Sequence, residues 1–89
     1  MLRSVSPVQL LRYCRLGDDD PLAETAIEIA AAKEEHLDRQ GIPLNEKTRG
    51  RFGLCVMAWT LHELDHPGEA APLGVMQMIN DLRFTTQGG

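Results

Sequence analysis

The sequence predicts an all-α fold: a short first helix, a long second helix, a buried central third helix and a short C-terminal helix, packed as a small bundle with an extended C-terminal tail. Apolar residues recur at helical spacing in four segments, and capping or Pro-Gly signals separate these segments. No stretch alternates apolar and polar side chains as a half-buried strand does. We expect a single domain of 89 residues, with residues 1–83 as helical core and residues 84–89 as flexible tail.

Composition restricts the classes of function. A domain this small buries only about 60 to 65% of the surface of its unfolded chain, so we expect its stability to be marginal or shared with partners. The net charge of −4 argues against a nucleic-acid binder held by phosphate contacts. No apolar run approaches the roughly eighteen residues of a membrane span, and no signal-peptide pattern is visible. We therefore expect a soluble chain made in the cytoplasm and not bound to membrane.

The first two helices begin at capping signals. Ser6-Pro7 predicts the start of a helix that runs to Leu16, with Gly17 ending it. Asp20 is the predicted cap of the second helix, which we expect from Leu22 to about Arg39, with an apolar arc on one side. The three adjacent aspartates also suggest a metal loop, but no further oxygen donors follow at calcium-loop spacing.

A turn at Gly41–Asn45 leads into the third helix, with Gly41 at the C-terminal cap and Asn45 as the next cap. Three cations follow in a short stretch: Lys47, Arg49 and Arg51. They form either a solvated basic turn or a docking patch for an acidic partner.

The central segment Arg51–His66 is apolar on two sides, which is typical of a buried helix. One stripe comprises Phe52, Cys55, Val56 and Trp59, and the opposite one Leu54, Met57, Ala58, Leu61 and Leu64. Shorter helices, or neighbouring copies of the chain, must pack against it. Cys14 and Cys55 both lie on apolar stripes, which favours reduced core thiols.

The same segment contains His62-Glu63-Leu64-Asp65-His66, which fits the H-E-x-x-H spacing of zinc peptidases. Such a site needs a third protein ligand, for which only Glu69 and Asp81 are candidates, and a surface that holds the peptide. Imidazoles near a helix C-terminus also interact favourably with the helix dipole and can bond to the last free carbonyls, which stabilises the helix. We therefore interpret the pattern as structural, and expect neither a catalytic residue, a metal site nor a cofactor.

Pro67-Gly68 ends the central helix. A last helix follows Pro72-Leu73-Gly74, with Val75, Met78, Ile79 and Leu82 at i, i+3, i+4 and i+7. The final segment, Phe84–Gly89, lacks helical periodicity and is expected to be mobile in isolation.

Several segments match a known family in order and spacing over nearly the whole chain. They are the short opening helix Ser6–Leu16, the acidic turn Asp18–Asp20 before an alanine-rich helix, Gly41–Leu44, the apolar central helix ending near His62-Glu63, and Pro72–Val75 with Ile79, Leu82 and Arg83. The chain resembles the small helical head-to-tail connector proteins of tailed bacteriophages, also called adaptor, head-completion or DNA-packaging proteins. The family commonly ends its third helix with an aromatic residue, Glu, Asn and Arg. This chain retains the Glu but lacks the Arg.

The resemblance implies a structural virion protein rather than an enzyme. Its copies would form a homo-oligomeric ring, a dodecamer in the virion, between the portal protein and a downstream tail or stopper protein, and DNA would pass through without specific binding. The implied portal-docking residues are Arg83, Phe84, Thr85, Thr86 and Gln87. The side chains expected to pack between protomers are Phe52, Val56, Trp59 and His62. The acids expected to face the channel are Glu24, Glu28, Glu35 and Asp38.

Two alternatives remain. One is a small zinc-dependent hydrolase that uses His62, Glu63 and His66. The other is a helical regulatory module that binds a partner through an amphipathic groove.

Overall fold

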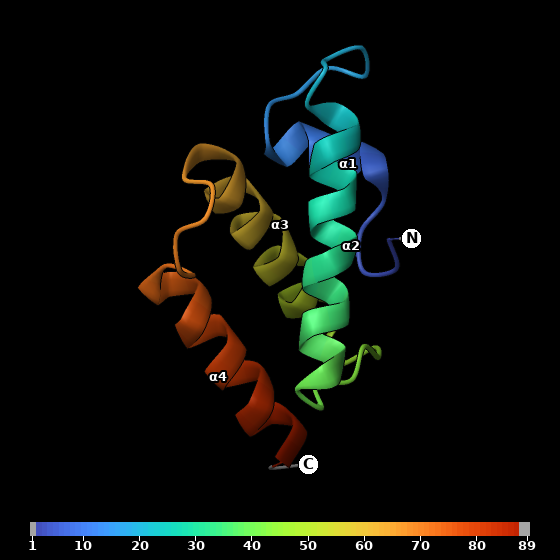
Figure 1. Ribbon diagram of the computed structural model, residues 1–89. Helices are drawn as coiled ribbons and strands as arrows, with labels where there is room; N and C mark the ends of the chain where they lie inside the picture. The colour runs from blue at the N-terminus through green and yellow to red at the C-terminus, as the bar shows by residue number, and fades with distance from the viewer. Residues whose placement is uncertain (1, 88–89) are drawn as a thin grey trace.

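Four helices form the chain, in a computed structural model that describes residues 2–87 and the side chains of residues 2–84. They are α1 (Pro7–Tyr13), α2 (Ala23–Arg39), α3 (Arg49–Asp65) and α4 (Leu73–Gln87), and residues 2–87 include no strand. α3 packs against α2 on one side and α4 on another, whereas α1 lies against α2 (Figure 1). The predicted all-α bundle of four helices is confirmed.

One apolar core joins all four helices. Small side chains on α2, including Ala26 and Ala30 with no exposed surface, let the facing helices approach closely. The periodic positions predicted for the first and last helices are confirmed as core positions. These are Leu10 and Leu11 on α1, Cys14 at its C-cap, and Val75, Ile79 and Leu82 on α4. Met78, the fourth position predicted for the last helix, is half-buried against this core.

Both ends of α1 have a clear local cause. Ser6 is the predicted cap: its Oγ accepts from the Gln9 N–H at 3.1 Å, while the Gln9 side chain accepts from the Ser6 N–H at 3.0 Å. The helix ends earlier than predicted, because Arg15 adopts the left-handed conformation with φ 59°. The Leu16 N–H then donates to the Leu11 carbonyl at 2.8 Å, which closes the helix before Gly17.

The turns before α2 and α3 use the predicted residues with small shifts in register. Asp20 Oδ1 accepts from the Leu22 N–H at 2.9 Å, and α2 begins at Ala23, so Leu22 lies in the turn with 48% of its surface exposed rather than in the apolar arc. Gly41 has φ 82°, as its predicted capping position requires. Asn45 Oδ1 accepts backbone N–H groups at the start of α3, although the capping residue itself is Thr48.

α4 is longer than predicted. The extended tail expected from residue 84 is wrong for residues 84–87, which continue the helix to Gln87. Between Gly74 and Gly88 no Gly or Pro interrupts the sequence, so helical hydrogen bonding extends through the Thr pair despite its modest propensity. Gly88 and Gly89, the rest of the predicted tail, lie outside the described residues.

The single chain covers most of both apolar stripes of α3. Phe52, Cys55 and Val56 have no exposed surface, and the opposite stripe is half-buried against the core except for Leu54, which is 44% exposed. The prediction that Phe52 and Val56 pack between protomers is therefore wrong, because helices of the same chain already enclose them. Trp59 and His62 are only half-buried.

The segment before α1 is fixed by a buried carboxylate that the sequence analysis did not single out. Glu34 of α2 is 1% exposed and accepts from the backbone N–H groups of Arg3 at 2.9 Å and Ser4 at 2.6 Å, and from the Ser4 hydroxyl. On the α3 side, a Cβ at Gly53 would lie 2.7 Å from Val5 Cγ1. We call the contacts of Glu34 with Arg3 and Ser4 the N-terminal clamp.

Candidate functional site

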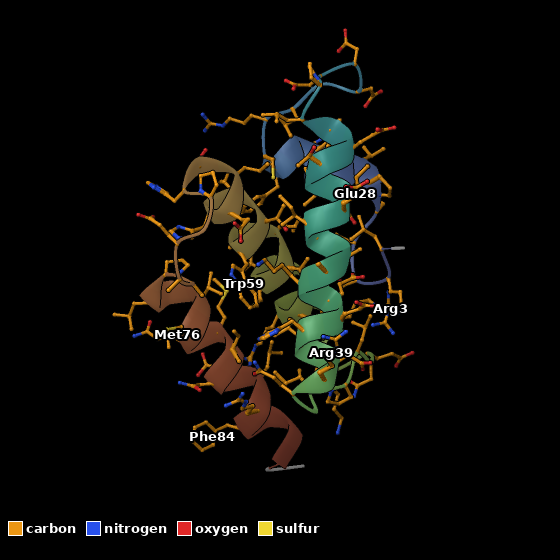
Figure 2. All side chains as sticks on the ribbon, in the orientation of Figure 1. Arg3, Glu28, Arg39, Trp59, Met76 and Phe84 are labelled. Carbon is orange, nitrogen blue, oxygen red and sulfur yellow. The ribbon has the colours of Figure 1, made fainter. Side chains whose placement is uncertain are left out.

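The C-terminal half of α3 and the facing part of α2 bring aromatic and charged side chains together around Trp59 (Figure 2). Lys33 Nζ lies 4.5 Å from the centroid of the Trp59 ring and 3.1 Å from Glu63 Oε1. The His36 ring meets the Trp59 ring edge-on, with centroids 5.3 Å apart and planes at 85°. Cation–π and edge contacts hold the indole in place, while part of its surface stays accessible.

A groove of about 310 Å³ lies between α2 and α4, with Trp59 contributing from α3. We call it the Trp59 groove. Met76 and Ile79 of α4 supply further apolar lining, and His36 of α2 and Gln40 at its C-cap supply polar lining. Arg83 of α4 also lines the groove and donates to the Gln40 side-chain oxygen, so a hydrogen bond links α4 to the C-cap of α2. None of the lining residues carries a carboxylate side chain.

The H-E-x-x-H side chains lie beside this groove, and each has a partner. The rings of His62 and His66 are 5.0 Å apart between centroids. His62 Nε2 lies 3.1 Å from the Ala70 carbonyl, and His66 Nδ1 lies 3.2 Å from a Glu69 carboxylate oxygen. Glu63 accepts from Lys33 and, at 3.1 Å, from the Gly68 N–H.

These contacts fasten the loop between α3 and α4. Because Ala70 lines the Trp59 groove, the His62 and Glu63 contacts hold the loop that forms one end of that groove. The Gly68 N–H, followed by the hydrogen bond and charge of Lys33, holds the pKa of Glu63 below its usual range. A carboxylate held in its charged form is a weaker general base, which disfavours the peptidase role. Among the described residues, no three His, Cys, Asp or Glu side chains are grouped to hold a metal ion.

The two cysteines lie in the core rather than at a reactive site. Cys14 and Cys55 are free and buried, as predicted from their stripes. Burial raises the pKa of Cys55 to about 11, and burial followed by the Asp65 charge raises the pKa of Cys14. Thiols with raised pKa values stay protonated near neutral pH, so neither is an activated nucleophile.

The outer face of α4 exposes large apolar side chains. Leu73 is 72% exposed, Met76 is 52% exposed and Phe84 is 73% exposed, and their spacing places them on one side of the helix. Figure 2 shows Met76 and Phe84 along the outer edge of α4. We call Leu73, Met76 and Phe84 the α4 outer face. Of the predicted docking residues, Phe84 belongs to it, whereas Arg83 reaches across to Gln40.

The remaining predicted site residues are not brought into that region. The side chains of Thr85, Thr86 and Gln87 lie outside the described residues. The four predicted channel acids are exposed on α2: Glu24, Glu28, Glu35 and Asp38. Three of them border a shallow hollow beside Arg3 of the N-terminal segment, and Glu35 lies 3.8 Å from Arg39.

Sequence reasoning identified Trp59 and His62 but missed the groove that Trp59 lines and whose Ala70 loop His62 contacts. Gln40, Met76 and Ala70 come from three different elements, and nothing in their local patterns relates them. One signal was present: Trp59 ends an apolar stripe just where His and Glu begin, so a partly exposed indole was to be expected there.

Comparisons with protein-family models, with curated proteins and with solved structures yield no match for this chain. In the described part of the chain, no helix combines the length and apolar character needed to cross a bilayer. Functional inference therefore depends on the resemblance in the sequence and on the geometry of the Trp59 groove and the α4 outer face.

Proposed function

We propose that this chain is a structural connector of a tailed bacteriophage. Its copies form a ring between the portal protein at the capsid vertex and the next tail component, and the ring extends the DNA channel after packaging. The order and spacing of the helical segments in the sequence support this proposal. The contacts of His62, Glu63 and His66 also support it. These side chains already bond to the loop between α3 and α4, which favours a structural role over a catalytic one.

The observation that carries the proposal is the α4 outer face. Leu73, the first residue of α4, and Phe84, in its last turn, are each more than 70% exposed, whereas Val75, Ile79 and Leu82 on the other side of the helix are buried in the core. Single exposed apolar residues are common, but a row of three on one helix face is typical of a protein-interaction surface. We assign this face to the portal. Since residues 84–87 are helical, portal docking uses a preformed helix rather than a tail that orders on contact.

Charge supports the conduit role. The chain has a net charge of −4, and the four acids on α2 are exposed. A channel wall of negative potential repels phosphates, so DNA slides past without specific binding. We keep Glu24, Glu28, Glu35 and Asp38 as the proposed channel-facing acids.

Binding to a portal ring tests the proposal. The portal protein of the phage or prophage that encodes this chain is purified as a ring, and bound chain is measured by co-sedimentation and by electron microscopy. We expect a ring of copies on the portal, and we expect Phe84→Ser to weaken binding about tenfold or more. Val8→Ser is the matched control, because Val8 is 59% exposed on α1, away from this face.

Wild-type protein that leaves portal rings bare would overturn the proposal. Equal binding by Phe84→Ser and wild type would show that the α4 outer face is not the portal-binding surface. A helical binding module is the second candidate, because the Trp59 groove is an apolar cleft with a polar rim. That candidate predicts a discrete complex with a soluble partner and no affinity for portal rings.

A further inference from the structure

We propose that the Trp59 groove receives the acidic turn Asp18–Leu22 of a second copy of this chain, so that copies join head to tail. This inference depends on the proposed function, since it names the contact between neighbouring copies of the ring. It concerns a surface that adjoins the one assigned to the portal and shares only Met76 with it.

The groove has the chemistry of a receptor for an acidic segment with one apolar side chain. Trp59 and Met76 provide an apolar surface, and Met76 is 52% exposed. Arg83 brings a guanidinium to the rim, where it also donates to Gln40, and His36 adds an imidazole whose Nε2 lies 2.6 Å from the Gln40 amide nitrogen. No lining side chain is a carboxylate. The whole chain has a net charge of −4, whereas the groove has a cationic side chain and no acidic one. Complementary charge around an apolar centre gives both attraction and register.

The turn before α2 has the matching features. Asp18 and Asp19 are exposed, and Leu22 is 48% exposed although it directly precedes α2. The turn is held in shape, because the Asp20 N–H donates to the Gly17 carbonyl at 3.1 Å and Asp20 Oδ1 accepts from the Leu22 N–H. A preformed turn loses little conformational freedom on docking.

The positions of turn and groove determine the kind of assembly. The turn projects beyond the N-terminal end of α2, at the top of the view in Figure 1. The residues that line the groove come instead from the C-terminal end of α2, from Trp59, from the loop between α3 and α4, and from α4. A contact between two different surfaces is heterologous, and repeated heterologous contacts close into a ring when the rotation allows it. The proposed contact therefore supplies what a ring requires, without using the α3 stripes that the single chain buries.

Charge-reversal variants test the contact. Asp19→Lys reverses a charge in the turn, and Arg83→Glu reverses a charge in the groove. Self-association is measured by sedimentation over a series of protein concentrations, without portal protein. We expect each variant alone to weaken self-association about tenfold or more, because like charges then meet. We also expect weaker wild-type association as salt is raised toward 1 M, where the Debye length falls to about 3 Å. Leu22→Ser removes the apolar anchor and should act in the same direction.

Mixing the two variants gives the sharpest readout. In an alternating assembly, the reversed turn of one variant meets the reversed groove of the other, and the native turn meets the native groove. We therefore expect an equimolar mixture to associate more strongly than either variant alone. Matched controls are Glu46→Lys for the turn and Arg12→Glu for the groove, both at exposed positions outside the contact, and circular dichroism checks the fold of every variant.

The inference is overturned by wild-type protein that remains monomeric at its highest soluble concentration, by single variants that associate like wild type, or by a mixture that recovers nothing. A closed dimer unaffected by these substitutions points to an isologous contact elsewhere and overturns it equally. Failure of the connector proposal is recognised separately. The readout is portal binding by the Asp19→Lys variant, whose α4 outer face is unchanged, at protein concentrations too low for self-association. Absence of that binding would overturn the connector proposal.

Discussion

Two glutamates in this chain each hold a neighbouring segment by hydrogen bonds, but their surroundings are very different. Glu34 in the N-terminal clamp is 1% exposed and accepts from the Arg3 and Ser4 backbone, whereas the Glu63 side chain is 25% exposed and accepts from Lys33 and Gly68. Only Glu63 belongs to a recognisable sequence motif. The contrast shows that burial, rather than motif membership, sets how much a carboxylate contributes to stability, because water can replace the lost partners of the exposed group only.

Replacing Glu34 should have the largest effect. Glu34→Ala leaves two backbone N–H groups and the Ser4 hydroxyl without their acceptor in a buried site, and we expect a loss of about 3 kcal/mol in the free energy of unfolding. For a chain of this length that corresponds to roughly 15 °C in Tm, measured by thermal unfolding followed by circular dichroism. Glu35→Ala is the control, because the Glu35 side chain is 72% exposed and should cost under about 0.5 kcal/mol. Equal losses for the two variants would refute the role of the clamp.

The other side of the N-terminal segment gives a smaller effect. Gly53→Ala places a Cβ 2.7 Å from Val5 Cγ1 and 3.4 Å from the Ser4 carbonyl oxygen. Val is stiff at χ1, so the segment must shift, and we expect a net loss of about 1 kcal/mol in urea unfolding, despite the better helix propensity of Ala.

Gly50 provides the matched substitution, since a Cβ there meets nothing within 4 Å. Gly50→Ala should therefore stabilise the chain by about 0.5 kcal/mol. Val5→Ala in the Gly53→Ala background should recover part of the loss. A Gly53→Ala variant as stable as Gly50→Ala would mean that the segment does not press on α3.

Glu63 sharpens the comparison through pH. Its pKa is lowered in the folded chain, chiefly by the Gly68 N–H and then by Lys33, so its contribution is present above the ordinary value near 4.5 and is lost as the pH falls through the folded pKa. Glu63→Gln should therefore cost less than about 1 kcal/mol at pH 7, with the exposed site reducing the effect, and nothing below the folded pKa. Urea unfolding of both proteins from pH 7 to pH 3 measures the difference. A difference that grows toward acid pH would contradict the assignment.

The position of Glu34 shows how far sequence reasoning reached. The buried residues of α2 follow the register Ala23, Ala26, Ala30, Glu34 and Leu37, so an acid at a core position was visible in the periodicity. Its donors were not, because residues 2–5 have no periodic pattern and their contact with α2 spans about thirty positions. Helices and core faces follow from local spacing, whereas this contact depends on tertiary packing.

The same distinction separates the predicted site from the observed one. Ser6, Gly41 and the α4 core face follow local rules of capping and periodicity, and the structure confirms them. The end of α4 was misjudged because weak helix formers were taken to end a helix that no Gly or Pro interrupts before Gly88. The Trp59 groove joins three helices and a loop, so only the packed chain reveals it.

Zinc should have the smallest effect, and it tests the Glu63 side of the comparison most directly. To ligate zinc, His62 would have to give up its contact with the Ala70 carbonyl, and His66 its contact with Glu69. We therefore expect added zinc to change Tm by less than about 1 °C. Binding with a Kd one hundredfold below the zinc concentration would instead add about 2.7 kcal/mol, or more than roughly 10 °C. His62→Ala is the paired variant: zinc retained by the wild type after dialysis but lost from His62→Ala would restore the hydrolase alternative.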